Sequence, residues 1–288
     1  MRRLRDYINL TKPTIMLLVV FTGATALILE GSLVTEPARF CLVLLGLYFS
    51  GGSANALNQC FERKIDARMK RTSARRPLPQ GRLGVVEAFA FSIAIGLAGV
   101  FLFAIFFNWL SAALALATIL FYSLFYTLYL KPNTDQNIVI GGAAGAMAPI
   151  IAWAAASGAV TLAPIVMFSI VFLWTPPHFW ALALFCSEDY KEVNLPMLPV
   201  SRGEEITYRW ILYYSFAVVV VSLTLLIAGA GWAYLAAALG LGGLMIRRAF
   251  AALRERTLSA QRGLFGYSIV YLFALFVAMI VDAALLKL

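Results

Sequence analysis

Long apolar runs alternate with short polar segments along almost the whole chain. A run of about 20 apolar residues is long enough to cross the hydrocarbon core of a bilayer as a helix. The pattern predicts nine membrane-spanning helices, at residues 14–29, 40–57, 85–107, 109–130, 138–156, 162–185, 210–228, 232–246 and 264–286. Two boundaries are weakly marked. Only Asn108 divides the third run from the fourth, and only residues 229–231 divide the seventh from the eighth.

The composition supports an all-α polytopic membrane protein. Of the 288 residues, 62% are hydrophobic and only 13% are charged, which excludes an ordinary soluble protein. The spans leave no room for a separate soluble domain, so we expect one transmembrane domain over residues 1–288. Cys41, Cys60 and Cys186 have neither paired nor metal-ligand spacing and are predicted to be free thiols.

The distribution of positive charge predicts an orientation. With a cytoplasmic N-terminus, all but Arg39 and Lys287 of the 23 Lys and Arg residues fall on the cytoplasmic side. The positive-inside rule therefore predicts that the N-terminus lies inside and the C-terminus outside. The loops also account for the net charge of +9, so we expect no nucleic-acid partner. Neither a cleavable signal nor a transit peptide precedes the first span, which favours a prokaryotic plasma (inner) membrane.

One polar stretch, residues 58–82, carries the main candidate chemistry. Asn58, Glu62 and Asp66 recur every four residues, so on a helix their side chains face the same way, and Lys70 continues the row. Such oxygen ligands suit Mg²⁺, which prefers to share its coordination with substrate phosphates. The same stretch holds basic residues that could receive a diphosphate: Arg63, Lys64, Arg68, Lys70, Arg71, Arg75 and Arg76. The alternative is an ordinary cytoplasmic loop, which explains the basic residues but not the periodic carboxylates.

A second polar loop, residues 187–208, follows the sixth span on the same predicted face. It begins with an acidic cluster that includes Glu188, Asp189 and Glu192, together with Lys191. Two acidic clusters on one face are what a bridging magnesium–diphosphate site needs. The alternative is a solvated loop that caps the seventh helix.

The sequence WTPPHFW, residues 174–180, lies in the sixth predicted span. Pro176 and Pro177 are expected to break or kink that helix. His178 is the only histidine in the chain. It either forms part of a cavity wall with the neighbouring aromatic rings, or is a core residue that satisfies backbone carbonyls freed by the prolines.

These motifs resemble those of a known family. NQCFERKIDARMKRT, followed by RRPLPQGR, is similar to the first signature of the UbiA-type intramembrane prenyltransferases, Asn-x-x-x-Asp-x-x-x-Asp. FLWTPPHFWALALF and DYKEVNLPMLPVSRG resemble the branch of that family that acts on heme, as do residues 137–158, the opening TKPTIMLLVVFTG and the ending LFGYSIVYLFALF. Glu62 stands where the family often has Asp. The second loop lacks the Asp-x-x-x-Asp of the members that prenylate quinone precursors.

The resemblance implies nine helices around a cavity that opens to the cytoplasmic side and to lipid. It also implies transfer of a farnesyl group from farnesyl diphosphate to a vinyl group of heme b, with addition of water and with Mg²⁺ as cofactor. The implied metal ligands are Asn58, Glu62 and Asp66, with Asp189 favoured from the second loop, and Lys70 joins them as a catalytic residue. The expected substrate-binding residues are Arg63, Arg71, Arg75, Tyr126, Lys131, Trp174, His178 and Lys191.

Two other functions are weighed against this one. A prenyltransferase acting on an aromatic quinone precursor would share the metal motif and differ at residues 174–199. A transporter or heme carrier would carry charges near the middle of the membrane and inverted repeats, whereas here the acidic residues lie at span ends and no clear repeat is present. Association with a downstream heme-modifying enzyme is left open.

Overall fold

The structure, a computed structural model, describes residues 2–286. In that range it is entirely helical, with nine candidate membrane spans. The spans are α2 (Pro13–Glu30), α3 (Pro37–Arg68), α5 (Val85–Phe106), α6 (Trp109–Leu120) with η1 (Phe121–Leu130) and α7 (Lys131–Asn133), α8 (Asn137–Ala146) with α9 (Ala148–Ser157), α10 (Leu162–Phe185), α13 (Glu204–Leu223) with η2 (Thr224–Leu226), α14 (Trp232–Glu255) and α15 (Leu258–Leu285). The predicted all-α polytopic class is confirmed. Lys287, predicted to lie outside, is beyond the described residues.

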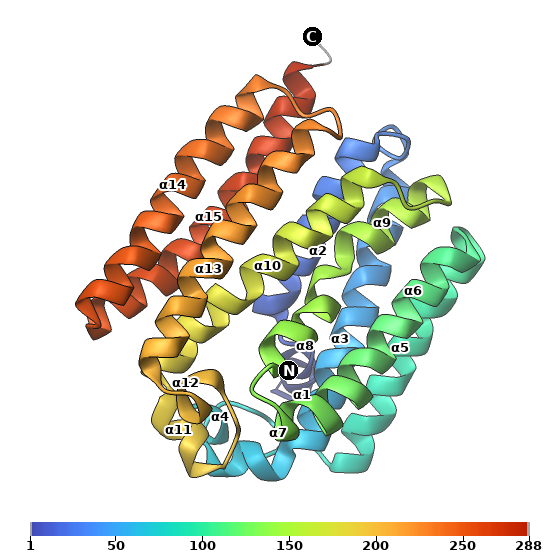
Figure 1. Cartoon of the computed structure of the whole chain (residues 1–288). Helices are drawn as coiled ribbons and strands as arrows, with labels where there is room; N and C mark the ends of the chain where they lie inside the picture. Colours follow the sequence, from blue (N-terminus) through green and yellow to red (C-terminus); the bar gives the residue numbers. More distant parts are fainter. Residues whose placement is uncertain (1, 287–288) are drawn as a thin grey trace.

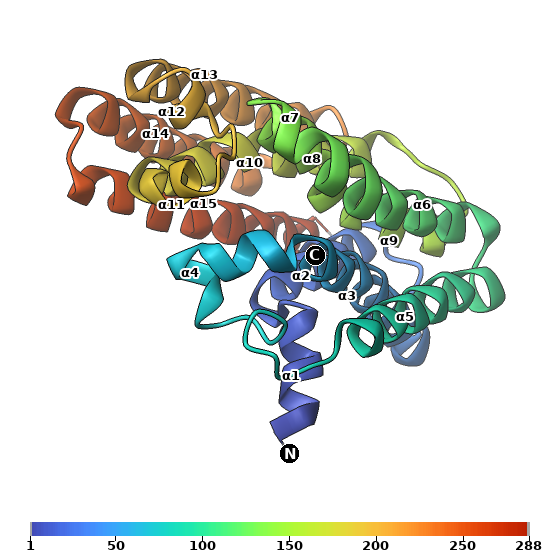
Figure 2. The same ribbon diagram turned by 90° about the horizontal axis from the view of Figure 1, so that it is seen from below.

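The spans form a closed bundle. Helices that follow one another in the chain pack together, and α15 returns to contact α2. Figure 1 shows α13, α14 and α15 on one side of the molecule and α5 and α6 on the other. The short helices α1 (Arg2–Leu10), α4 (Lys70–Ser73), α11 (Ser187–Glu192) and α12 (Leu198–Ser201) gather with α7 at one end, which Figure 2 views from below. The helix α15 ends at the opposite end of the bundle (Figure 1).

Both weakly marked boundaries are real helix ends. Asn108 caps α6, because its side-chain oxygen accepts a hydrogen bond from the Ser111 N–H at 2.9 Å. Its amide group donates to the Ala154 carbonyl at 2.7 Å, which ties this corner to α9. Between α13 and α14 the backbone at Gly229 has φ of 99°, a conformation that glycine adopts without strain.

Four helices extend well beyond the apolar runs that predicted them. The helix α3 continues to Arg68, and α14 continues to Glu255, while α13 and α15 already begin at Glu204 and Leu258. Hydropathy marks the part of a helix that lies in lipid, whereas polar residues with good helix propensity prolong it beyond the membrane. The extension of α3 keeps the Asn58–Asp66 segment helical.

Of the predicted break or kink at Pro176 and Pro177, the break is not found, because α10 is continuous through both residues. Packing against α8, α13 and α15 along its length holds the two halves together despite the missing proline N–H groups. The fifth span is interrupted instead. There α8 ends and α9 begins on either side of Met147, two residues before Pro149. Pro149 has no N–H to bond the carbonyl of Gly145, and this lost bond marks the interruption.

The outer surface is strongly apolar, as a membrane protein requires. Large side chains such as Ile105, Trp109 and Ile227 are more than two-thirds exposed, and in a bilayer this surface contacts lipid. Cys41, Cys60 and Cys186 are free thiols, as predicted.

Candidate active site

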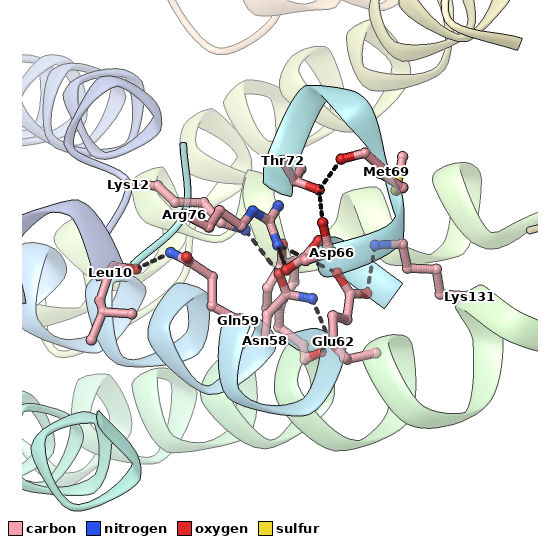
Figure 3. A network of polar contacts seen from close by, with 12 residues as sticks. Leu10, Lys12, Asn58, Gln59, Glu62, Asp66, Met69, Thr72, Arg76 and Lys131 are labelled. Atoms are coloured by element: carbon pink, nitrogen blue, oxygen red, sulfur yellow. Dashed lines mark hydrogen bonds and ion pairs between the residues drawn. The ribbon is translucent and has the colours of Figure 1, made fainter. Parts of the chain in front are cut away.

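Asn58, Glu62 and Asp66 occupy one buried face of α3, near the end of the bundle where the short helices gather (Figure 3). Their exposed fractions are 2%, 4% and 2%. One guanidinium reaches both carboxylates: Arg76 Nη1 bonds the Asp66 carboxylate and lies 3.8 Å from Glu62 Oε2. The common face predicted from the four-residue spacing is therefore confirmed.

Three cations surround the two carboxylates. Arg76 pairs with Asp66 and lies near Glu62, and Lys131 pairs with Glu62 from the end of the fourth span. Lys12 donates a hydrogen bond to Asn58 Oδ1 at 2.9 Å. Burial, reinforced by the nearby Arg76, lowers the pKa of Lys12 to about 7. Arg76 and Lys131 already balance the two carboxylates, and protonated Lys12 adds further positive charge, so the cluster is suited to receive an anion.

The orientation of the Asn58 amide follows from its partners. Protonated Lys12 donates to the oxygen Oδ1, and the amide nitrogen donates to Thr127 Oγ1 at 3.1 Å. Thr127 in turn donates its hydroxyl hydrogen to the Tyr122 carbonyl, five residues earlier, at 2.8 Å. The segment η1 is π-helical, a winding that is often found at functional sites. This chain of bonds directs Asn58 Oδ1 into the cluster.

The second polar loop lies at the same end of the bundle. Arg68 Nη2, at the end of α3, donates to the backbone carbonyl of Glu192 at 3.0 Å, which confirms that the two predicted loops share one face. Burial raises the pKa of the Cys186 thiol, and the charges of Arg71 and Asp189 both act on this group.

Asp189 and the two carboxylates of α3 do not come together as a three-residue metal site in the described structure. Among residues 2–286, no three His, Cys, Asp or Glu side chains meet closely enough to hold a metal ion. Lys191 pairs with Glu188 at 2.9 Å on the exposed side of α11. The ligands that the second loop contributes stay a prediction.

The remaining predicted basic residues lie around the cluster rather than in it. Lys70, Arg71 and Arg75 are exposed on the segment that follows α3. Arg63 is half-buried and donates to the carbonyl of Cys60 at 3.0 Å. Their predicted contact with diphosphate is not tested by this arrangement.

The predicted aromatic residue Tyr126 is a packing residue of the fourth span. It is 9% exposed and stacks on Tyr122 with ring centroids 5.1 Å apart. Its ring lies against Gly141 of α8, where an added Cβ atom would come within 2.2 Å of it. Tyr126 thereby fixes the position of η1, which carries Thr127 and precedes Lys131.

Trp174 and His178 connect α10 to α15. The Trp174 indole donates to the Ser268 carbonyl at 2.7 Å, and His178 Nδ1 lies 2.8 Å from Ser268 Oγ. The hydrogen-bond partner of His178 is thus a hydroxyl group on another span. The alternative, in which the imidazole satisfies carbonyls freed by the prolines, is not what the structure shows.

Two residues of the cluster, Lys12 and Thr127, were not named as candidates from the sequence, and Arg76 was named only among the basic residues that could receive a diphosphate. Thr127 lies four residues before Lys131, a spacing that places both on one side of an ordinary helix and could have indicated it. Nothing in the sequence distinguishes Arg76 from its neighbour Arg75. Lys12 lies directly before the first span and is indistinguishable there from a topological charge.

The donor atoms fit a divalent cation such as Mg²⁺. The cluster offers one amide oxygen, from Asn58, and the carboxylate oxygens of Glu62 and Asp66, all hard ligands of the kind that Mg²⁺ prefers. Arg76 and Lys131 balance these carboxylates, and both could turn toward the oxygens of a diphosphate that arrives with the metal.

A bundle of membrane spans with a buried cluster of oxygen ligands and cations at one end is suited to a metal-complexed, phosphate-bearing substrate. Residues 17–280 match the UbiA prenyltransferase family, and the chain belongs to this family.

Individual relatives agree with the family assignment. The chain is 47% identical to the protoheme IX farnesyltransferase of Erythrobacter litoralis over 290 residues, which cover 96% of this chain and 92% of that protein. It is 45% identical to the protoheme IX farnesyltransferase of Symbiobacterium thermophilum, with 96% and 94% covered. The fold is similar to a solved structure of digeranylgeranylglyceryl phosphate synthase, with a TM-score of 0.81, 20% identity and full coverage of both chains. A UbiA homologue from Archaeoglobus fulgidus bound to GPP and Mg²⁺ gives a TM-score of 0.64 at 17% identity, over 95% of this chain and 99% of that one.

Proposed function

We propose that this chain transfers the farnesyl group of farnesyl diphosphate to a vinyl group of heme b, with addition of water, giving heme O and diphosphate. The observation that carries the proposal is the 47% identity to a protoheme IX farnesyltransferase over nearly the whole of both chains. The cluster on α3 supports it independently, since a prenyl donor presents the diphosphate that such a cluster would bind.

The site would hold the metal–diphosphate through Asn58, Glu62 and Asp66. Mg²⁺, when bound, would supply positive charge against which the diphosphate leaves. Lys131 and Arg76 already lie beside the carboxylates, so they are positioned to donate hydrogen bonds to diphosphate oxygens as negative charge develops there. The exposed Lys70, Arg71 and Arg75 are proposed to guide the anion toward the cluster.

The reaction balances without a protein nucleophile. The bond between farnesyl C1 and the diphosphate oxygen breaks, and its electron pair leaves with the diphosphate. The π electrons of the vinyl group form the new bond to farnesyl C1. Water then adds to the cationic carbon next to the porphyrin and loses a proton. The surrounding protein has to keep water from the farnesyl carbon until the new bond has formed.

The experiment is a reaction of purified protein in detergent with heme b, farnesyl diphosphate and Mg²⁺, with products identified by mass. We expect a product whose mass equals heme b plus the farnesyl group and one hydroxyl group. If the protein prenylates an aromatic quinone precursor instead and leaves heme b unchanged, the acceptor that we propose is wrong.

We also propose that the end carrying both polar loops faces the cytoplasm. The motivating observation is the charge bias, combined with the contact between Arg68 and Glu192 that holds the two loops together. In a cysteine-free background, Ser73→Cys and Ser201→Cys should react with an impermeant maleimide only after the cells are opened. Labelling of either position in intact cells would reverse the orientation.

A further inference from the structure

The imidazole of His178 is held on both faces by aromatic rings. Trp174 stacks on one side with ring centroids 4.4 Å apart and an angle of 17°, and Phe265 of α15 stacks with centroids 4.6 Å apart at 22°. Phe179 meets the imidazole edge-on at 5.1 Å. The ring therefore cannot turn freely, and its two nitrogen atoms have fixed and different surroundings.

Ser268 determines which nitrogen carries the proton. Its hydroxyl oxygen lies 2.6 Å from the Phe265 carbonyl and 2.8 Å from His178 Nδ1. The carbonyl can only accept, so the single hydroxyl hydrogen is donated to it. The hydroxyl oxygen must then accept a hydrogen bond from His178, which requires a proton on Nδ1. The Ser268 carbonyl also accepts the Trp174 indole hydrogen, so α15 holds Trp174 and His178 together.

This arrangement leaves the other nitrogen with a free lone pair. His178 Nε2 has no hydrogen-bond partner among residues 2–286. Nε2 is not fully buried either. The fully buried side-chain atoms without a partner in that range are Gln59 Oε1, Asn137 Oδ1, Trp180 Nε1 and Tyr271 Oη, and Nε2 is not among them. An accessible imidazole nitrogen whose opposite N–H is fixed by a hydrogen bond is the usual arrangement of a metal-ligating histidine.

We infer that Ser268 is a positioning residue for the acceptor: it holds His178 with the proton on Nδ1, so that Nε2 ligates the iron of heme b. The inference rests on the proposed function, because the iron belongs to the proposed substrate. It assigns the wall formed by α10 and α15 to the porphyrin and the cluster on α3 to the diphosphate. The hydrogen bonds of His178 and Ser268 join α10 to α15 and do not reach the cluster on α3.

The tautomer can be measured directly. Because the chain contains one histidine, protein labelled with ¹⁵N-histidine gives a single pair of ring signals in an NMR spectrum. Without heme, we expect a protonated Nδ1 and an unprotonated Nε2. Ser268→Ala should lose this preference and give a mixture of tautomers. A proton on Nε2 in the wild-type protein would overturn the inference, whether or not Nδ1 also carries one.

Ligation is tested by comparing heme b with protoporphyrin IX, which lacks the iron. We expect His178→Ala to remove the nitrogen-ligand signature from the absorption spectrum of bound heme. Ser268→Ala should weaken heme binding by about tenfold, the lower end for loss of a group that orients a metal ligand. Binding of protoporphyrin IX and of magnesium–farnesyl diphosphate should stay unchanged in Ser268→Ala.

If Ser268→Ala weakened the binding of heme b and of protoporphyrin IX equally, Ser268 would be merely structural. Weaker binding of farnesyl diphosphate in Ser268→Ala would have the same meaning. An unchanged heme spectrum in His178→Ala would exclude ligation. These outcomes differ from failure of the proposed function, in which the wild-type protein would neither bind nor farnesylate heme b.

Discussion

Substituting Arg76 by glutamine removes the cation that reaches both carboxylates of the cluster. The Asp66 side chain is 3% exposed, and its ion pair among residues 2–286 is the one with Arg76, whereas Glu62 keeps its pair with Lys131. Removing one partner of a buried ion pair costs about 3–5 kcal/mol, because the other charge stays buried without compensation. The Arg76 side chain is 18% exposed, and the solvent that reaches it screens the pair, so we expect the lower end, about 3 kcal/mol.

The assay is denaturant unfolding in mixed micelles with EDTA present, comparing wild type, Arg76→Gln and Arg75→Gln. Arg75 is the adjacent residue, and its side chain is exposed. The same substitution there should change the free energy of unfolding by no more than about 0.5 kcal/mol. Equal effects at the two positions would refute the buried-pair account.

Magnesium and diphosphate provide a second comparison for Arg76→Gln. A divalent cation bound by Asp66 and Glu62 would replace the missing positive charge. We therefore expect the stability difference between Arg76→Gln and wild type to shrink when both ligands are added. A difference that stays the same would mean that these carboxylates do not bind the metal.

Three further predictions follow from the contacts around the cluster. Gly141→Ala should destabilise the protein by about 1–3 kcal/mol, because the added carbon overpacks against the Tyr126 ring. The control Gly145→Ala, with nothing within 4 Å of the added carbon, should be neutral or slightly stabilising. Similar free energies of unfolding for the two variants would contradict the contact. Thr127→Val should raise the KM for magnesium–farnesyl diphosphate by about tenfold, because the Asn58 amide loses its acceptor, while Thr127→Ser should retain the wild-type value. Chelation by EDTA should abolish turnover and added Mg²⁺ should restore it, whereas activity that persists in EDTA would argue against a metal-dependent site.

The spans were predictable from the sequence because hydropathy alone determines which segments can lie in lipid. The start of α6 was predictable from Asn108, because its cap is a local interaction. The prolines were harder to interpret. Each proline lacks a backbone N–H, yet the helix is interrupted near Pro149 and continues through Pro176 and Pro177. The packing around each helix decides the outcome.

The site was predictable as far as its periodicity reached. The four-residue spacing placed Asn58, Glu62 and Asp66 on one face of a helix, and they lie there. The cations that pair with them depend on how distant segments meet. Arg76 returns to α3 through the turn after α4, and Lys12 reaches Asn58 from the start of α2. No property of either residue in the linear sequence indicates this contact.

The central claim is that the buried cluster on α3 binds magnesium–diphosphate. It is tested most directly by calorimetric titration of farnesyl diphosphate into Asp66→Asn, with and without Mg²⁺. The matched control is Glu36→Gln, a half-exposed carboxylate at the other end of α3. We predict that Asp66→Asn loses the Mg²⁺-dependent part of the affinity and its turnover, while Glu36→Gln keeps both. Wild-type Mg²⁺-dependent affinity in Asp66→Asn would contradict the account.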